Sequence, residues 1–362
     1  MTCKHFGLCG GCSLQNLPSE EYRARKRDIV VQALARAGLG DMEVAAPVIV
    51  PEHSRRRAVF KLAKHGSAVE VGFHAARSHS IVNMAECLVL TPALFALAEM
   101  ARVALAPILN QGEKAELHVT ESDTGLDLAF RSPRKLTPAL TAQFAAAFSG
   151  RNIARIFFNR DVMMENAAPA IVLGGVRVTL PPHAFLQATR EGEAALVNHV
   201  LAMTQGARHV ADLFAGLGTF TFALARHARV HAVEQDADAL AALASAAKNA
   251  FAPVGSGAKG LKPITTERRD LFKQPLTAPE LKPFDAVLLD PPRAGAEAQV
   301  RALADSAIAR IAYVSCDAAS FARDAAILKI AGFRPGPVTP IDQFLYSGHI
   351  ELVAGFERKT RR

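Results

Sequence analysis

The sequence predicts an α/β protein whose C-terminal half is a mostly parallel sheet with helices on both faces. From about residue 181 onward, apolar strand-like runs alternate with helix-like runs, which is typical of successive βαβ units. Residues 47–178 instead contain short alternating or β-branched runs and two Ala/Leu-rich helical stretches, which indicates a mixed α+β domain. Residues 1–17 are polar and hold three of the five cysteines. We therefore expect three domains, covering residues 1–46, 47–178 and 179–362.

The expected elements follow in chain order. Residues 19–39 read as a helix that Ser19 caps and that Gly38 and Gly40 end. The central domain is expected to contain strands 58–62, 69–73, 117–120, 126–131, 155–158 and 170–178 and helices 92–108 and 138–148. The C-terminal domain is expected to contain strands 209–214, 230–234, 264–268, 284–290, 310–315, 334–339 and 349–356, with helices such as 236–249 and 318–331. Ligands bind at the carboxyl ends of parallel strands, so the residues that follow these strands are the functional candidates.

Composition favours a polyanionic partner. The 362 residues carry a net charge of +8, with basic clusters at residues 23–27, 55–57 and 359–362, although a mildly basic enzyme would also fit. Tryptophan is absent and aromatic residues make up 6%, which disfavours a surface that grips single strands by repeated stacking. No apolar run reaches the ~18 residues that a membrane span needs, and cysteines replace the apolar core of a signal peptide. A cytoplasmic protein with no membrane partner is expected.

The glycine-rich turn after the first parallel strand is the candidate cofactor site. Gly216 and Gly218 let the backbone approach a ligand closely, and the next helix presents free N–H groups. Glu234 ends the second strand, where a carboxylate can accept hydrogen bonds from both ribose hydroxyls. The third glycine of the dinucleotide fingerprint is missing, which favours S-adenosylmethionine although a nucleotide redox cofactor also fits. Asp270 ends the third strand and is expected either to bind the adenine amino group or to cap a helix.

Two further strand ends carry groups suited to covalent chemistry. Asp290 precedes two prolines, which stiffen its turn. Arg293 stands where amino-group methyltransferases carry an aromatic residue, which disfavours methylation of an amino nitrogen. Cys316 follows strand 310–315, and the helix after it is expected to lower the pKa of the thiol, unless this cysteine is only an apolar filler. Glu351 lies in an apolar run, where burial would raise its pKa toward that of a base, unless it faces outward.

A thiol and a base in one pocket suit methylation at carbon 5 of a pyrimidine. Carbon 5 is a poor nucleophile, but thiolate addition at carbon 6 makes an enolate whose carbon 5 can attack a methyl sulfonium. A base must then remove the carbon 5 proton so that the thiol can leave. Cys316 is the candidate nucleophile, Glu351 the candidate base and His349 a supporting neighbour.

With these motifs, the chain resembles the S-adenosylmethionine-dependent RNA uracil-5 methyltransferases, and within them the bacterial 23S ribosomal RNA branch. The resemblance is carried by Cys3-x5-Cys9-x2-Cys12 with Cys87, Phe185-Leu186-Gln187, residues 212–220, Glu234, residues 290–293, Ser315-Cys316-Asp317, Ala322-Arg323-Asp324 and His349-Ile350-Glu351. It implies a class I Rossmann-like methyltransferase domain with a seven-stranded, mostly parallel sheet. Many members of the family carry an N-terminal β-barrel RNA-binding domain, whereas this chain begins at the first cysteine motif, so we expect that domain to be absent.

The resemblance assigns roles to individual residues. It implies that Cys316 is the nucleophile and Glu351 the proton acceptor. It implies that the cofactor and base pocket is lined by Gln187, Phe214, Thr219, Glu234 and Asp290, beside Gly216, Gly218 and Asp270. Arg323 is expected either to organise the catalytic loop or to form a structural salt bridge. The family often has Asn where Thr219 stands, which leaves a side-chain contact with the cofactor open there.

Four cysteines remain once Cys316 is set aside for chemistry. A Cys-x2-Cys pair alone is compatible with zinc and with an iron–sulfur cluster, and two further thiols complete a closed four-thiolate site. The resemblance selects a [4Fe–4S] cluster held by Cys3, Cys9, Cys12 and Cys87. We expect this cluster to pin residues 1–17 onto the central domain and to help shape an RNA surface.

The sequence therefore predicts a cytoplasmic, monomeric enzyme that forms 5-methyluridine in 23S ribosomal RNA. One alternative is a transfer-RNA uracil-5 methyltransferase, which the N-terminal cysteines disfavour. Another is an iron–sulfur redox protein or an RNA-binding assembly factor that has kept a methyltransferase fold.

Overall fold

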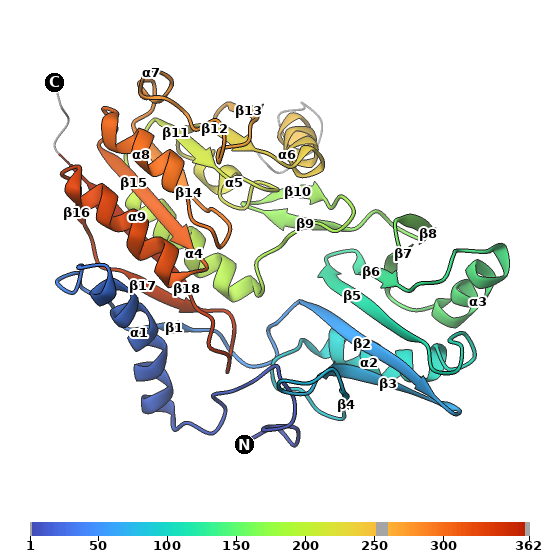
Figure 1. The fold of residues 1–362 in the computed structure, drawn as a ribbon. Coiled ribbons are helices and arrows are strands. Elements are labelled where there is room, and N and C mark those ends of the chain that lie inside the picture. The colour runs from blue at the N-terminus through green and yellow to red at the C-terminus, as the bar shows by residue number, and fades with distance from the viewer. Residues whose placement is uncertain (1, 251–259, 359–362) are drawn as a thin grey trace.

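The computed structural model describes residues 2–250 and 260–358, so the predicted basic cluster 359–362 lies outside the described residues. Within the described residues, the strands form three sheets (Figure 1). A large sheet makes up the C-terminal half, a second sheet makes up the central region, and a short hairpin lies between them. None of the described helices is both long enough and apolar enough to cross a membrane.

The large sheet has nine described strands, in the order β1-β17-β18-β15-β14-β11-β12-β13, with β16 paired to β18. Its strands are β1 (Val48–Ile49), β11 (His209–Leu213), β12 (Arg229–Glu234), β13 (Ile264–Arg268), β14 (Ala286–Leu289), β15 (Arg310–Ser315), β16 (Arg334–Pro335), β17 (Thr339–Asp342) and β18 (Glu351–Glu357). β11 to β15 pair in parallel, and β18 runs antiparallel to β15 and β17. An α/β methyltransferase-type sheet was predicted, but with seven strands.

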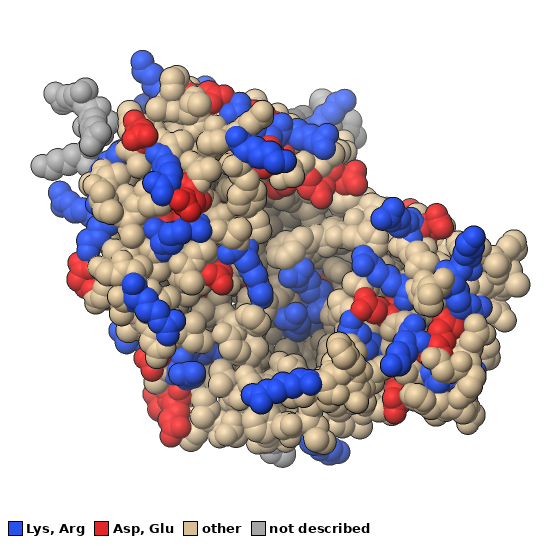
Figure 2. All heavy atoms as spheres, in the orientation of Figure 1, with Lys and Arg blue, Asp and Glu red and all other residues tan. Residues whose placement is uncertain are grey.

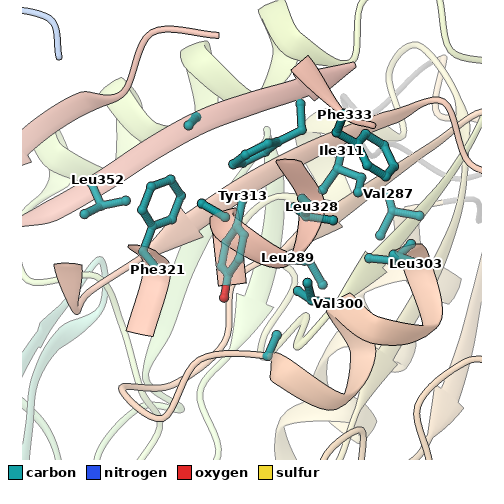
Figure 3. Close-up of a cluster of buried hydrophobic side chains, with 14 of the residues drawn as sticks. Val287, Leu289, Val300, Leu303, Ile311, Tyr313, Phe321, Leu328, Phe333 and Leu352 are labelled. Carbon is teal, nitrogen blue, oxygen red and sulfur yellow. The ribbon is translucent and has the colours of Figure 1, made fainter. Parts of the chain in front are cut away.

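Helices cover both faces of this sheet. They are α1 (Ser19–Arg36), α4 (Arg190–Met203), α5 (Thr221–Leu224), α6 (Ala237–Ala250), α7 (Ala278–Leu281), α8 (Glu297–Asp305) and α9 (Ala318–Ile330). Alternate residues of β14 and β15 point to opposite sides, so Leu289 and Tyr313 pack with α8 and α9 on one face (Figure 3). Leu288 and Val314 pack with α4 and α5 on the other face. A sheet buried on both faces explains why its strands read as continuous apolar runs.

The N-terminal helix α1 lies on the large sheet. Val30 and Leu34 are fully buried in the core that α8 and α9 form with this sheet. The predicted cap at Ser19 is wrong: Pro18 occupies the N-cap position, without a side-chain cap. The chain then adds β1 in parallel to β17, pairing Val48 with Ile341. The domain boundaries at 46 and 178 stay a prediction, but α1 and β1 both pack on the C-terminal sheet.

The central sheet has seven described strands, in the order β4-β3-β2-β5-β6-β7-β8. They are β2 (Arg57–His65), β3 (Ala68–His74), β4 (Ile81–Asn83), β5 (Lys114–Ser122), β6 (Gly125–Arg131), β7 (Ile153–Phe158) and β8 (Asp161–Glu165). Helices α2 (Pro92–Ala104) and α3 (Pro138–Phe148) pack into a core with one face of this sheet. Each helix begins at a threonine N-cap, Thr91 or Thr137, followed by a proline. At this position an N–H group would have no partner within the helix, so proline loses no hydrogen bond there.

The short hairpin corrects one predicted strand. Residues 170–178 were predicted to be continuous, but β9 (Ala170–Leu173) and β10 (Val176–Thr179) are antiparallel partners. Gly174 and Gly175 form the turn between them with φ values of +53° and +84°. A two-residue turn with both φ values positive is the geometry for which a Gly-Gly pair is suited.

Candidate active site

A cavity of about 880 Å³ lies where the carboxyl ends of the parallel strands face the central sheet. Figure 2 shows a hollow between the two lobes of the molecule with Lys and Arg atoms on its floor. Ten of the residues singled out in the sequence line this cavity: Gln187, Phe214, Gly216, Thr219, Glu234, Asp290, Arg293, Cys316, His349 and Glu351. Cys3, Cys9, Cys12 and Cys87 line the same cavity. The fold thus brings the predicted cofactor, reaction and cysteine sites to one place.

The glycine-rich turn and Glu234 form a preorganised end of the cavity. The N–H of Gly216 donates to Oε2 of Glu234 at 2.8 Å, and the N–H groups of Gln235 and Asp236 donate to Oε1 at 2.7 and 2.8 Å. These bonds fix the carboxylate and use both lone pairs of Oε1, while Oε2 keeps one lone pair free to accept a further hydrogen bond. Gly216 has a φ of +55° and no atom within 4 Å of where a Cβ would lie. The donor set and the open space beside Gly216 fit a ribose-containing cofactor.

Two predicted cofactor residues do not line the cavity. Gly218 has a φ of +90°, and a Cβ there would lie 2.7 Å from the ring of Phe222, so this glycine serves close packing. The Asp270 carboxylate accepts from the N–H of Phe272 at 3.1 Å and pairs with Lys273 at 3.2 Å, so it holds its own turn. Residues 271–273 form a turn and the next helix begins at Ala278, so the predicted helix cap is wrong and the adenine contact stays a prediction.

Phe272 is a cavity residue that the sequence reasoning missed. It lines the cavity, and its ring centroid lies 5.5 Å from that of Phe214. The available signal was an aromatic residue in the loop after β13, at the edge of the sheet where side chains face ligands.

The register of β15 and β18 brings the candidate nucleophile next to the candidate base. Ser315 pairs with Leu352, so Cys316, which follows Ser315, lies opposite Glu351, which precedes Leu352. Asp290 follows the neighbouring strand β14, and its N–H donates to the carbonyl of Leu213 at 3.2 Å. Three acidic or nucleophilic groups therefore share one edge of the sheet.

The Cys316 thiol is not activated in the predicted way. Burial raises its pKa to about 11, and the charges of Glu351 and Asp290 add to this effect. The expected helix effect is offset because the Asp317 carboxylate already accepts from the N–H groups of Ala319 and Ser320, at 3.0 and 2.8 Å. The prediction of a lowered thiol pKa is therefore wrong for this arrangement, and the thiol needs a proton acceptor.

The Glu351 side chain has the properties of such an acceptor. It is 4% exposed, and burial raises the pKa of its carboxyl to about 7, against the opposing effects of Gln343, Arg57 and Arg293. Burial also raises the pKa of Asp290 well above its ordinary value, and the charge of Glu351 contributes. Acids with pKa values shifted toward neutrality are typical of proton-transfer sites.

Gln343 is a second residue that the sequence reasoning missed. It is 1% exposed, its Nε2 donates to Oε1 of Gln187 at 2.6 Å, and its Oε1 accepts from the N–H of Ala188 at 2.9 Å. It also forms a hydrogen bond with Glu351 that lowers the pKa of that carboxyl. Gln343 therefore joins the cofactor side of the cavity to the candidate base. A lone glutamine after a strand gives no pattern that could have identified it.

Arg323 belongs to a supporting ion-pair network. Its Nε donates to Asp324 at 2.8 Å, and its terminal nitrogen donates to the carbonyl of Ala294 at 3.0 Å. The fully buried Asp324 in turn accepts from the N–H of Ala296 at 2.7 Å and from the hydroxyl of Tyr313 at 2.6 Å. This favours the structural salt bridge, which holds the loop after Asp290.

The four cysteines that were predicted to bind a cluster, Cys3, Cys9, Cys12 and Cys87, are partly buried, and their thiols interact electrostatically. Burial and the charges of Cys87, Cys9 and Cys3 raise the pKa of the Cys12 thiol to about 12. The N–H of Gly11 points to the sulfur of Cys9 at 3.4 Å. Among residues 2–250 and 260–358, no group of three or more His, Cys, Asp or Glu side chains is arranged to hold a metal ion.

Comparison with known proteins supports one family. The family model described as tRNA (uracil-5-)-methyltransferase matches residues 132–359. The chain is 44% identical to an uncharacterized RNA methyltransferase of Rhizobium meliloti, covering 98% of this chain and 85% of the relative. It is 32% identical to the 23S rRNA (uracil(1939)-C(5))-methyltransferase RlmD of Chromohalobacter salexigens, covering 99% of this chain and 76% of that protein.

One solved structure supports the fold. The tRNA (uracil-54, C5)-methyltransferase of Pyrococcus abyssi, in complex with S-adenosyl-L-homocysteine, superimposes with a TM-score of 0.72 at 22% identity, covering 96% of this chain and 84% of that one. The chain therefore belongs to the tRNA (uracil-5-)-methyltransferase family of S-adenosylmethionine-dependent RNA methyltransferases.

Proposed function

We propose that this protein methylates carbon 5 of a uridine in 23S ribosomal RNA. The observation that carries the proposal is the pairing of Ser315 with Leu352, which sets Cys316 opposite Glu351 in the cavity that also holds Glu234. Similarity to RlmD over 99% of the chain supports the 23S target, and the protein is expected to act in the cytoplasm as a monomer.

The first step is covalent addition to the ring. The target uridine leaves its stack and enters the cavity, since its carbon 6 cannot be reached inside a helix. Cys316 gives its proton to the Glu351 carboxylate while its sulfur bonds to carbon 6, and the electron pair of the double bond moves onto the O4 side of the ring. With a pKa of about 7, Glu351 can then release that proton to water before it is needed again.

The second half of the reaction restores the ring. S-adenosylmethionine, when bound, supplies an electrophilic methyl group that carbon 5 takes. Glu351 then removes the proton from carbon 5, the carbon 6–sulfur bond breaks, and Cys316 leaves with the electron pair of that bond. Burial raises the pKa of Asp290 well above its ordinary value, and the protonated form of this carboxyl is the form that donates a hydrogen bond to a ring carbonyl and stabilises the enolate.

We also propose that Cys3, Cys9, Cys12 and Cys87 hold a [4Fe–4S] cluster. The support is that all four partly buried thiols line one cavity and that N–H groups point to two of the sulfurs, at 3.4 Å for Cys9 and 3.5 Å for Cys3. Thiolates are the ligands of such clusters. The proposed role is to hold residues 1–17 against the central sheet. Iron and sulfide analysis of anaerobically purified protein tests this part.

The function is tested with purified protein, methyl-labelled cofactor and both 23S and transfer RNA. We expect label at one uridine of 23S RNA, located by nuclease mapping, and none after Cys316→Ala substitution. Label in transfer RNA alone would assign the transfer-RNA activity instead. Undiminished methylation by the Cys316→Ala protein would overturn the covalent mechanism.

A further inference from the structure

Of the three consecutive arginines 55–57, one is buried in an ion pair, and the side chains of the other two face the active-site cavity. Backbone pairing fixes this segment from two neighbouring segments. Arg55 forms isolated β-bridges with Leu90 and Thr189, and the N–H of Arg56 donates to the carbonyl of Ala188 at 3.0 Å. Arg56 is 2% exposed and pairs with Glu193 at 2.6 Å. Because side chains alternate along extended chain, Arg55 and Arg57 point the other way, and both line the active-site cavity.

Arg55 and Arg57 are cations with no directly paired anion among the described residues, although the charge of Glu351 acts on Arg57 and the charges of Cys87 and Cys12 act on Arg55. Among the described residues, neither guanidinium forms an ion pair or a side-chain hydrogen bond, and the Nε of Arg57 is buried with no partner. Their contacts are aromatic: the Arg57 guanidinium lies 4.1 Å from the ring centroid of Phe185, and that of Arg55 lies 5.8 Å from the ring of Phe344. Removing a cation from water without pairing it is unfavourable, so this arrangement indicates a bound anion.

A second cavity continues from these arginines. It measures about 320 Å³ and shares Arg55, Arg57 and His183 with the active-site cavity. It lies on the face of the central sheet that α2 and α3 leave uncovered, since its lining includes Val59 of β2 and Arg131 of β6, which alternate with core residues. Its volume is near the lower end of the roughly 300–1,000 Å³ of small-molecule sites.

The lining of the second cavity suits a nucleobase better than a lone ion. The exposed ring of His183 lies 5.4 Å from the ring of Phe157, which is itself buried under the Arg155 guanidinium, so His183 supplies the aromatic surface of this cavity. The one carboxylate among its described lining residues, Asp127, is neutralised by Arg155 at 2.8 and 3.0 Å. Burial and the charge of Arg131 lower the pKa of His183, which keeps this ring neutral at pH 7. One neutral, exposed aromatic ring beside the Arg55 and Arg57 guanidinium groups matches a base and its phosphate.

We propose that Arg55 and Arg57 bind backbone phosphates beside the target uridine, and that the second cavity takes the base of a neighbouring, unpaired RNA nucleotide. The proposal rests on the proposed function, because it assumes a uridine extruded toward Cys316. The two arginines lie between the reaction centre and the second cavity, as the phosphates on either side of an extruded nucleotide must. The cofactor carboxylate is the other anion that could reach them, and the test separates the two.

The test measures binding, so it does not depend on methyl transfer. RNA affinity and S-adenosylmethionine affinity are each measured for Arg57→Met, Arg55→Met and the control Arg151→Met, whose exposed arginine lines neither cavity. For each cavity variant we expect weaker RNA binding and a slope of log affinity against log salt reduced by about 0.7, the value for one single-strand phosphate contact. Cofactor affinity should not change, and the control should keep the full slope.

Two results would overturn the assignment of the arginines. Weaker cofactor binding with an unchanged salt slope would assign them to the cofactor carboxylate. Unchanged affinity for both ligands would make them structural. If the wild-type protein binds RNA with the expected slope but methylates no uridine, the proposed function fails while the phosphate site stands.

The second cavity is tested with the wild-type protein and RNA that is abasic at single positions near the target. Loss of one stacked base should weaken binding about 5- to 150-fold at one position and little elsewhere. Equal binding by every abasic RNA would overturn this half of the proposal.

Discussion

The active-site cavity has two walls that are held in different ways. The sheet wall consists of Asp290, Cys316 and Glu351, which directly follow or begin strands of the large sheet. The cysteine wall consists of Cys3, Cys9, Cys12 and Cys87, which lie outside the helices and strands, with one isolated β-bridge from Cys9 to Ala75. Continuous strand pairing fixes the first wall, whereas the second depends on a few backbone bonds, such as those from Ser13 and Leu14 to the carbonyl of Tyr346 at 2.7 and 3.0 Å.

This difference separates the chemistry from its support. The sheet wall carries Cys316 and Glu351, the groups proposed to react and to transfer protons, and strand pairing would keep its geometry without the cysteines. The cysteine wall has little apolar burial of its own and needs either a cluster or its anchors to stay in place. Substitutions on the two walls should therefore be distinguishable by what they disturb.

The largest effect is expected from Glu351→Gln on the sheet wall. Removing the base should lower kcat by about 10²- to 10⁴-fold, the usual contribution of general base catalysis, and leave the enzyme–RNA adduct unresolved. Steady-state methylation and denaturing gels measure the two effects. Glu357→Gln, at the exposed end of the same strand, is the matched control. Normal turnover by the Glu351→Gln protein would remove Glu351 from the mechanism.

Lys26→Met should break a buried ion pair next to the loop that contains Tyr346. Ser13 and Leu14 beside the cysteine wall donate to the carbonyl of this tyrosine. Lys26 and Asp342 are both fully buried and pair at 2.7 Å, and Lys26 also donates to the carbonyl of His349 at 2.7 Å. Leaving the Asp342 carboxylate unpaired should cost about 3–5 kcal/mol of unfolding free energy, measured by urea denaturation. Lys329→Met, which breaks an exposed pair with Asp41, should cost about 1 kcal/mol or less. Equal costs would contradict the buried anchor.

Cys12→Ala should loosen the cysteine wall alone. We expect loss of bound iron and roughly 10- to 100-fold faster amide hydrogen exchange at Ser13 and Leu14, as a local opening would give. Exchange in β15 and affinity for S-adenosylmethionine should stay as in the wild type. Slow exchange at Ser13 and Leu14 in the substituted protein would mean that the backbone hydrogen bonds to Tyr346 hold this segment in place without the Cys12 thiol.

The smallest effect is the pH dependence of turnover. The base must be deprotonated, and burial raises the pKa of Glu351 to about 7, so activity is lost as pH falls through this value. Turnover at pH 6 should be about 10-fold below that at pH 8. A flat profile over this range would assign the proton transfer to a group with an ordinary carboxyl pKa.

The sheet wall was largely predictable from the sequence. The predicted strands 264–268 and 310–315 have the observed bounds of β13 and β15. The apolar run of β15 between two helices leaves little ambiguity, whereas β13 was predictable from its isoleucine and threonines, which favour strands. The two-residue strand β1 was not predictable, since two residues carry no period. Its pairing with β17 arises only after the chain has folded back.

The electrostatics of the site were only partly predictable. The raised pKa of Glu351 followed from its apolar neighbours in sequence, but the raised pKa of Cys316 did not. The raised pKa of Cys316 depends first on burial and then on the carboxylates of Glu351 and Asp290, which other strands contribute. The helix amides that were expected to stabilise a thiolate bond to Asp317 instead. Gln343 acts through contacts with residues far away in the chain, and no local pattern reports them.

The central claim is that the sulfur of Cys316 bonds to carbon 6 of the target uridine. RNA carrying 5-fluorouridine at that position tests it most directly, because fluorine cannot leave as a proton does and the final elimination stops. With S-adenosylmethionine present, we expect a stable protein–RNA adduct whose mass maps to the peptide containing Cys316, and no adduct with Cys316→Ala. An adduct on another cysteine, or complete turnover without one, would contradict the account.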